Sequence, residues 1–412
     1  MWTSSRGTSC PSGIPMMWLF ITTTCFLCGT LSVSGLINLE PEVNPEVWMS
    51  ISEIITYNGY PSEEHEVTSE DGYILSVNRI PHGRRNAHLK DPRPVVYLQH
   101  ALFADNAYWL ENYSNGSLGF LLADAGYDVW MGNSRGNTWS RRHKTLSPAD
   151  EAFWAFSFDE MAKYDLPGII NFIVNKTGQE KLYFIGHSLG TTIGFVAFST
   201  LPEVARRIKM NFALSPVVSF KYPTGIFTNF FLLPSSSIKK FFGTKGFFLE
   251  DKKRRDFAIR LCSSKILRLL CSEFMFLWAG ADWKNINMSR LDVYMSHAPT
   301  GTSVQNILHI KQLYRSSEFR AYDWGDETQN MQHYNQTRPP RYDLRAMNVP
   351  TAVWVGGHDV LVTLRDVARV LPQIRNLQYF QLLPKWNHFD FIWGLDAPVV
   401  YRKIIDLMKE NP

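Results

Sequence analysis

A serine near the middle of the chain stands in a sequence that suits nucleophilic catalysis. Ser188 belongs to Gly-His-Ser-Leu-Gly, which has the form G-x-S-x-G; apolar, β-prone residues 182–185 precede it, and a stretch at 191–200 rich in Ala, Phe, Ile and Val follows. A strand, a sharp turn and a helix in this order predict a nucleophile elbow. Small residues are needed at both ends of the turn, because a side chain at position 186 or 190 would collide with the neighbouring strand or helix.

A serine hydroxyl is a poor nucleophile at neutral pH, so it needs a base, and the base needs an orienting acid. In α/β-hydrolases the acid and then the histidine follow the serine along the chain. A predicted strand at 351–355 is followed by Gly-Gly-His-Asp, which ends at Asp359, and one at 378–383 by Pro-Lys-Trp-Asn-His, which ends at His388. Both residues lie just beyond a strand's carboxyl end, where open sheets form their sites. We therefore predict that His388 is the base and Asp359 its acid.

Other histidines and acids compete for these two roles. Asp390 follows His388 too closely to orient its imidazole easily, and Asp366 lies inside a predicted helix. His187 is expected to face away from the site, and His358 to be a packing or surface residue. Three further histidines lie in a helical stretch where no sheet fixes their position: His297, His309 and His333.

The tetrahedral oxyanion formed in acyl transfer needs two N–H donors. One is the backbone N–H of the residue after the nucleophile, which is Leu189, and the other comes from the loop after an earlier strand. That loop follows the predicted strand at 93–99, and its Leu102 is our choice for the second donor; the alternative is that His100 and Leu102 only pack the loop. The sequence has no H-E-x-x-H motif, paired C-x-x-C or phosphate-binding glycine loop, so no metal or cofactor is predicted.

The order of predicted elements indicates an α/β protein. Strands alternate with helices from residue 64 to about 216 and again from 351 to the end, which implies a mainly parallel sheet covered by helices on both faces. The stretch between them, about 217–341, is aromatic, basic and predicted to be helical. The 412 residues are 45% hydrophobic and carry a net charge of only +4, so the chain suits a large core and not a nucleic-acid-binding surface.

Residues 1–34 are interpreted as a cleaved secretory signal. Arg6 gives a positive start, residues 14–31 are mostly apolar, and Ser32-Val33-Ser34 supplies small residues at alternate positions. A retained membrane anchor is the alternative. Five N-x-S/T sequons support the secretory route: Asn112, Asn115, Asn175, Asn287 and Asn335.

Two cysteines remain after the predicted signal. Cys262 and Cys271 are close in sequence, and in an oxidising compartment they suggest one disulfide that closes a short loop. Two reduced, buried thiols are the alternative.

Several blocks of sequence together resemble the acid lipase family, which includes gastric and lysosomal acid lipases. They are Leu98-Gln99-His100 and residues 128–137, 164–167 and 387–394, and the resemblance covers essentially the whole chain after residue 34. It implies an α/β-hydrolase fold: a mainly parallel central sheet with helices on both faces, formed by residues 35–218 and 342–412, and a helical cap inserted at 219–341. It also implies a lid near 250–279, clasped by the two cysteines.

The family hydrolyses esters of long acyl chains, such as triacylglycerols and cholesteryl esters, and within it the chain is similar to a secreted branch linked to the outer epidermis. Two departures bear on activity. Gastric and lysosomal members have Gln after the nucleophile, where this chain has Leu189, and they have His-Gly-Leu where Ala101 replaces the glycine. If that glycine has a positive φ, alanine strains the loop.

These observations lead to a secreted serine lipase that acts on long-chain esters at a lipid–water interface without a cofactor; a lysosomal destination is the alternative. An acyltransferase or a short-chain esterase could use the same triad. A lipid-binding protein that kept the fold but lost catalysis is the alternative from another class. A fluorophosphonate probe that fails to label Ser188 would favour that last reading.

Overall fold

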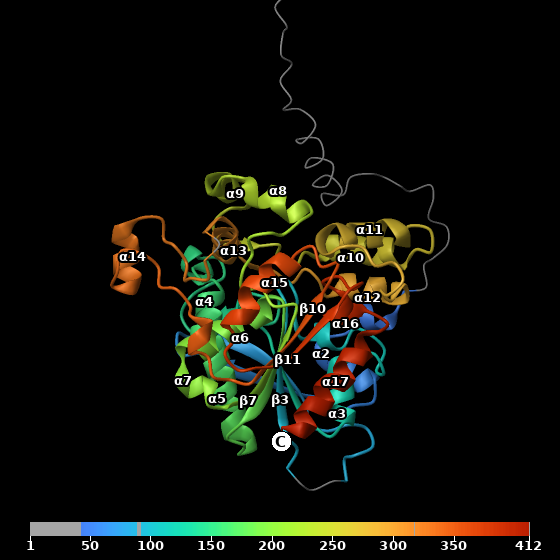
Figure 1. Cartoon of the computed structure of the whole chain (residues 1–412). Helices are drawn as coiled ribbons and strands as arrows, with labels where there is room; N and C mark the ends of the chain where they lie inside the picture. The colour runs from blue at the N-terminus through green and yellow to red at the C-terminus, as the bar shows by residue number, and fades with distance from the viewer. Residues whose placement is uncertain (1–42, 89–91, 317, 412) are drawn as a thin grey trace, which may run out of the picture.

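The structure is a computed structural model that describes residues 43–88, 92–316 and 318–411. Its centre is a nine-stranded sheet in the order β1-β2-β4-β3-β6-β7-β10-β11, with β5 paired to β2 (Figure 1). The strands are β1 (Glu63–Thr68), β2 (Tyr73–Ile80), β3 (Val95–Gln99), β4 (Asp128–Gly132), β5 (Arg142–His143), β6 (Leu182–His187), β7 (Ile208–Leu214), β10 (Thr351–Gly356) and β11 (Leu377–Leu383). From β4 to β11 neighbouring strands are parallel, whereas β2 pairs antiparallel with β1, β4 and β5.

Helices cover both faces of this sheet, as a mainly parallel sheet requires. In β3, Val96 and Leu98 belong to the hydrophobic cluster that includes α3 and α17, whereas Val95 and Tyr97 belong to the cluster that includes α5 and α6. The predicted α/β-hydrolase architecture is therefore confirmed. The helices of this core are α2 (Ile51–Tyr57), α3 (Leu118–Asp124), α4 (Phe158–Glu160), α5 (Leu166–Thr177), α6 (Leu189–Thr200), α7 (Pro202–Ala205), α15 (Leu364–Val370), α16 (Asp390–Trp393) and α17 (Ala397–Glu410).

The chain between β7 and β10 is largely helical and lies beyond the carboxyl ends of the parallel strands (Figure 1). We propose that residues 219–341 of it form the cap and that residues 35–218 and 342–412 form the core; the proposed signal, 1–34, lies outside the described residues. The cap helices are α8 (Ile226–Leu232), α9 (Ser235–Phe242), α10 (Lys252–Ser263), α11 (Arg268–Ala279), α12 (Leu291–Ser296), α13 (Val304–Ser316) and α14 (Glu327–Tyr334).

Two local features of the structure were not predicted from the sequence. The cap was expected to be helical, but β8 (Gly246–Phe247) pairs with β9 (Thr302–Ser303), a ladder too short to show an alternating pattern. Residues 158–177 are helical throughout, but a π-helical turn (Met161–Asp165) lies between α4 and α5. Asp165, in that turn, pairs with the buried Arg135 of the loop after β4.

Candidate active site

Ser188 lies at a sharp turn between β6 and α6, as the nucleophile elbow requires. Its backbone has φ 52° and ψ −121°, a conformation that side-chain-bearing residues seldom adopt. The flanking glycines permit the turn. A Cβ on Gly190 would lie 2.2 Å from the carbonyl oxygen of Gln99, and one on Gly186 would lie 2.8 Å from the carbonyl carbon of Gly190. The predicted need for small residues therefore has a specific steric cause.

Asp359 and His388 follow β10 and β11 and meet beyond the ends of these strands. His388 Nδ1 lies 2.8 Å from Asp359 Oδ2, and both side chains are buried. Because a carboxylate only accepts hydrogen bonds, Nδ1 carries the proton and Nε2 is left free to act as a base. Ser188 and His388 line the same cavity. This is the arrangement that the sequence predicts for a base, its acid and a nucleophile.

Asp359 is held by more donors than His388 alone. Its Oδ1 accepts hydrogen bonds from the backbone N–H groups of Leu361 and Val362, each at 2.8 Å. Its Oδ2 also accepts one from the Ser215 hydroxyl. The carboxylate is therefore fixed on both oxygens before it orients the imidazole.

Two residues that contact the Asp359–His388 pair were not predicted from the sequence. Ser215 is fully buried just after β7, with φ 48°. His187, expected to face away from the site, instead lies beside the base: its Nε2 is 3.1 Å from the His388 carbonyl oxygen, and the two ring centres are 4.7 Å apart. Tyr108 OH lies 3.0 Å from His187 Nδ1. His187 thus holds the backbone at His388 through a hydrogen bond to its carbonyl oxygen.

The Ser215 hydroxyl predicts a measurable effect on catalysis. Ser215→Ala removes a donor from the oxygen that orients His388, so we expect kcat to fall roughly 2- to 12-fold, because one such hydrogen bond is worth about 0.5–1.5 kcal/mol. Ser219→Ala is the control, because Ser219 donates to a different acid, Asp366. An unchanged kcat in a folded Ser215→Ala variant would contradict this role.

The competing residues lie in other environments. Asp366 accepts from Ser219 and from the N–H groups of Lys221 and Tyr222. Asp390 accepts from the Asn387 N–H and does not orient the imidazole. The remaining competing histidines have other surroundings: His358 is exposed, His333 stacks on Trp324, His309 contacts Ser157, and His297 lies near Asp105.

The proposed oxyanion donors, Leu102 and Leu189, line the same cavity as Ser188, the proposed nucleophile. Leu189 is the first residue of α6, so its N–H has no partner within the helix. The Leu102 N–H donates to no backbone carbonyl in the part of the chain that the structure describes. Both groups are therefore available to a developing negative charge.

A hydrogen bond from the loop after β4 holds the loop that carries Leu102 in place. His100 Nε2 accepts a hydrogen bond of 3.0 Å from the Ser134 N–H, so His100 has a packing role in the loop. Ala101 does not have the positive φ that would make alanine strained; Phe103, two residues later, does, at 63°. The replacement of glycine by Ala101 therefore introduces no backbone strain.

A cavity of about 260 Å³ opens at these residues, and we call it the acyl cavity. Its walls are mostly apolar and come from both the core and the cap. They include Phe220, Phe231, Met275, Trp278 and Trp393. An apolar cavity with a few polar groups at one end suits a ligand with a long hydrocarbon part.

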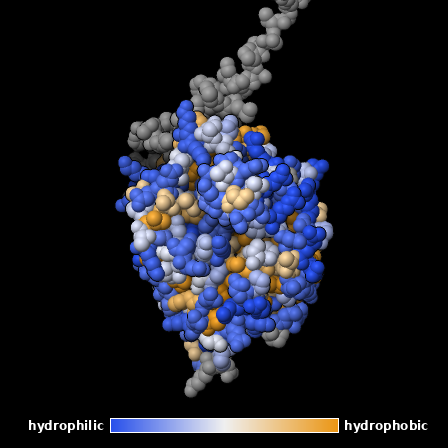
Figure 2. Space-filling view, turned by 90° about the vertical axis from the view of Figure 1, so that its left-hand side faces the viewer, coloured by the Kyte–Doolittle hydropathy of each residue, from blue (hydrophilic) through white to orange (hydrophobic). Residues whose placement is uncertain are grey.

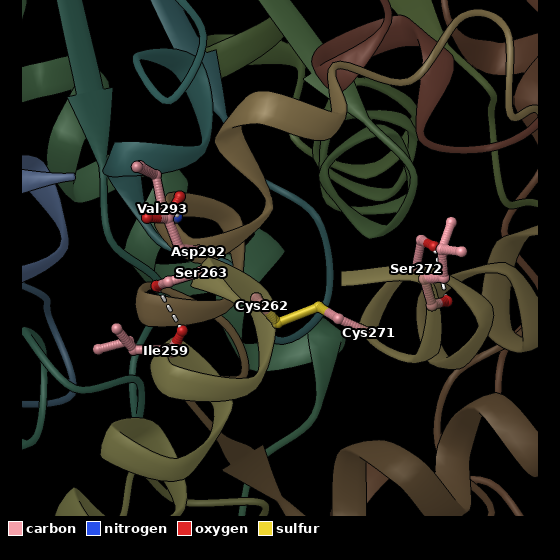
Figure 3. Close-up of a disulfide and its surroundings, with 8 residues drawn as sticks. Ile259, Cys262, Ser263, Cys271, Ser272, Asp292 and Val293 are labelled. Carbon is pink, nitrogen blue, oxygen red and sulfur yellow. Dashed lines mark hydrogen bonds between the residues drawn. A yellow bond between two sulfur atoms is a disulfide. The ribbon is translucent and has the colours of Figure 1, made fainter. Parts of the chain in front are cut away.

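The part of the cap proposed as the lid consists of α10 and α11. A disulfide joins Cys262 near the end of α10 to Cys271 in α11 (Figure 3). α10 also contributes Arg254, Arg255 and Ala258 to the walls of the acyl cavity. The disulfide thus ties together two helices that cover the site.

A buried acid behind the cavity predicts a pH-dependent stability. Burial raises the pKa of Glu111 from 4.5 to about 8. The charge of Asp105 acts in the same direction, whereas the charges of His297 and Arg290 and the hydrogen bond from Trp393 lower the pKa. Between these two pH values the native state keeps a proton that the unfolded state releases, so stability falls as pH rises. We expect Glu111→Gln to reduce the loss of unfolding free energy between pH 5 and pH 8 by roughly 1–3 kcal/mol.

Chemical denaturation at both pH values measures this effect. Glutamine keeps an acceptor for the Trp393 N–H, which lies 2.6 Å from Glu111 Oε2. The exposed Glu410→Gln variant is the control and should keep the wild-type dependence. Equal pH slopes in all three proteins would show that Glu111 is not the group responsible.

The five sequons differ in accessibility. Asn115, Asn175 and Asn335 are exposed. Asn112 and Asn287 are buried, and their side chains hydrogen-bond each other at 3.1 Å. We therefore propose the three exposed asparagines as the acceptors for glycans, since the amides of the other two are engaged in this conformation.

Residues 43–88, 92–316 and 318–411 contain no group of three or more His, Cys, Asp or Glu side chains placed to hold a metal ion. Over the same ranges, none of the helices has both the length and the apolar character needed to span a bilayer.

Comparisons with known proteins agree with this geometry. A family model described as the alpha/beta hydrolase fold matches residues 94–395, and one described as a partial alpha/beta-hydrolase lipase region matches residues 51–113. An alpha/beta hydrolase fold protein from Nakamurella multipartita superimposes with a TM-score of 0.51 at 12% identity, covering 84% of this chain and 98% of that one. At this identity the likeness concerns the fold alone.

Curated relatives are far more similar in sequence. Lipase member N of Homo sapiens is 77% identical over 395 residues, covering 96% of this chain and 99% of that protein. Human lysosomal acid lipase/cholesteryl ester hydrolase is 54% identical, covering 94% and 97%. The secreted branch linked to the outer epidermis, to which we likened the sequence, is that of lipase member M. Mouse lipase member M is 55% identical, covering 90% and 88%, which is well below the 77% of lipase member N, so that placement within the family is wrong. The chain belongs to the acid lipase family of the alpha/beta-hydrolase superfamily.

Proposed function

We propose that the protein is a secreted serine lipase that hydrolyses carboxylic esters of long-chain acyl lipids, of the triacylglycerol or cholesteryl ester type. The observation that carries the proposal is the Asp359–His388 pair, which lies with Ser188 at the wall of an apolar cavity. The relatives named as lipases support the same reaction class. A lysosomal destination is the alternative to secretion.

In the proposed mechanism Ser188 Oγ attacks the ester carbonyl while His388 Nε2 takes its proton. The N–H groups of Leu102 and Leu189 hold the oxyanion. His388 then returns the proton to the leaving alcohol, and an acyl-enzyme remains on Ser188. A water molecule, deprotonated by His388, releases the fatty acid. Asp359 keeps the imidazole in the required tautomer throughout.

The cap surface supports action at a lipid–water interface. Large apolar side chains are exposed on the cap helices α8, α9 and α11: Leu232, Phe241, Phe242, Leu269, Leu270 and Leu277. On the face shown in Figure 2, hydrophobic residues are scattered singly or in small groups among hydrophilic ones. Concentrated exposed apolar side chains mark an interaction surface. Two of these helices, α8 and α11, also contribute Phe231 and Met275 to the walls of the acyl cavity. A lipid surface is therefore the partner that we propose.

The test compares substrates with the purified, processed protein. Trioleoylglycerol and cholesteryl oleate are assayed against tributyrin and a soluble acetate ester, across pH 4–8 and with and without an added alcohol acceptor. We expect the long-chain emulsions to be hydrolysed faster than the soluble ester. A preference for soluble short chains would identify an esterase, and dominant transfer to the alcohol an acyltransferase. Failure of a fluorophosphonate to label Ser188 would favour a binding protein.

A further inference from the structure

The basic side chains of the protein are concentrated in one part of the cap. Residues 234–268, which include α9 and α10, contain ten Lys and Arg and three Asp and Glu, whereas the rest of the chain contains 32 Lys and Arg and 35 Asp and Glu. The small net charge of the chain is therefore the sum of a cationic segment and a slightly acidic remainder. We call residues 234–268 the basic cap segment. It lies with α8 and α11 at the end of the molecule opposite the C-terminus (Figure 1).

Most of the positive charge of this segment faces solvent. Its acids are partly neutralised within it, because Glu250 pairs with Arg255 at 2.8 Å. Asp251 likewise lies 3.8 Å from Arg254. Six other basic side chains of the segment are exposed, and none of them forms an ion pair with a residue that the structure describes: Lys239, Lys240, Lys252, Lys253, Arg260 and Lys265.

The order of charges in α10 does not stabilise the helix itself. Four basic residues in succession, 252–255, form its first turn, which contains no acidic residue. The helix dipole disfavours cations there by roughly 0.3–1 kcal/mol each. Asp251 offsets part of this cost, because its side chain accepts a hydrogen bond of 2.9 Å from the Arg254 N–H. Helix stability therefore does not explain the basic run, whereas an anionic partner would.

Exposed aromatic side chains lie beside these charges. In α9, Phe241 and Phe242 directly follow Lys239 and Lys240, and Phe241 is 75% exposed. Ile238 holds the other face of this helix in a hydrophobic cluster of the cap. Aromatic and basic side chains presented together by one helix are typical of attachment to an anionic lipid surface. An anionic polysaccharide would pair with the lysines but leave Phe241 uncovered.

We propose that the basic cap segment docks on a lipid surface that contains anionic phospholipid, with its lysines beside the phosphates and Phe241 in the headgroup region. The inference rests on the proposed function and specifies the surface at which the enzyme acts. Triacylglycerols and cholesteryl esters carry no charge, so they cannot pair with these lysines. The fatty acid is released only after docking, so the charge that the segment meets first belongs to phospholipid in the same surface.

The first experiment measures binding of the purified, processed wild type to vesicles by cosedimentation. Vesicles of phosphatidylcholine are compared with vesicles that also contain phosphatidylglycerol. Each Lys or Arg close to an anionic surface raises binding by about fivefold, so several together should raise the partition coefficient by roughly 10²-fold. The gain should shrink at high salt, because screening shortens the reach of the charges. Phosphatidylcholine vesicles with oleic acid, and a heparin oligosaccharide, are tested in parallel.

The second experiment assigns the gain to the basic cap segment. A fourfold variant that combines Lys239→Gln, Lys240→Gln, Lys252→Gln and Lys253→Gln should bind the two kinds of vesicle within about threefold of each other. The matched control removes four exposed charges near the amino ends of the parallel strands or the end of α17, and it should keep the wild-type gain: Lys181→Gln, Arg206→Gln, Arg375→Gln and Lys409→Gln. Thermal unfolding checks that both variants fold.

The outcomes separate this inference from the proposed function. Equal binding of the wild type to both kinds of vesicle would overturn the inference, and so would an equal loss in the two fourfold variants, while lipase activity would stand. A gain with oleic acid or heparin but not with phosphatidylglycerol would also overturn it. If lysine-dependent binding occurs but no long-chain ester is hydrolysed, the proposed function fails and a lipid-binding protein remains. If the lysine variant does not fold, the wild-type comparison still decides.

Discussion

Ser188→Ala is expected to lower kcat for a long-chain ester by roughly 10⁴–10⁶-fold, the range seen when a serine nucleophile is removed. Without Oγ no acyl-enzyme can form, and the remaining machinery only polarises the bound ester. The fold should persist, because alanine and serine are about equally strained at φ 52°. We therefore expect an unfolding free energy within about 1 kcal/mol of the wild type.

The measurement combines titration of released fatty acid, fluorophosphonate labelling and thermal unfolding. Ser199→Ala on the same helix is the control, because its hydroxyl donates to the Phe195 carbonyl of that helix. It should retain activity and labelling. Residual turnover in Ser188→Ala above about one per cent of the wild type would assign the nucleophile to another residue.

Asp359→Asn should lower kcat by about 10³–10⁴-fold with little effect on KM. The carboxylate accepts hydrogen bonds on both oxygens, from Leu361 and Val362 at Oδ1 and from His388 and Ser215 at Oδ2. An amide cannot satisfy both sides. If its NH₂ group takes the Oδ2 position, His388 Nδ1 must accept and the proton moves to Nε2, which is then no longer a base. If it takes the Oδ1 position, it faces two backbone N–H groups.

Asp390→Asn is the matched control for this prediction. Asp390 is also buried and close to His388 in sequence, but burial raises its pKa to about 7, so at pH 5 it is mostly protonated and an amide imitates it. We expect this variant to keep most of the wild-type activity at pH 5. Assaying both variants at pH 5 and pH 7 separates the two acids, and a greater loss in Asp390→Asn would exchange their roles.

The main features of the fold and the positions of the proposed triad could be predicted because they depend on local sequence. An apolar strand, a glycine turn and a helix surround Ser188, and each of the other two residues follows a strand. The carboxyl ends of parallel strands meet at one edge of a sheet, so residues after β6, β10 and β11 are brought together by topology. The meeting of these three residues can therefore be predicted without knowing any side-chain contact.

The supporting contacts could not be predicted, because they join residues that are distant in sequence and have no motif. Ser215 follows β7 in an ordinary Ser-Pro pair, and only the packing of β7 beside β10 brings it to Asp359. His187 was expected to face away from the site, but the loop after β11 brings the His388 carbonyl oxygen to 3.1 Å from its Nε2. The burial of Asn112 likewise depends on Asn287, which lies in the cap.

The Cys262–Cys271 bond has a consequence for how substrate enters. Since it links α10 covalently to α11, neither helix can swing outward without pulling on the other near this point. Arg255 of α10 borders the acyl cavity and pairs with Glu250 at 2.8 Å. Displacing the linked helices would therefore open the acyl cavity in one concerted movement, so that a lipid would enter by a single step and not past each helix in turn.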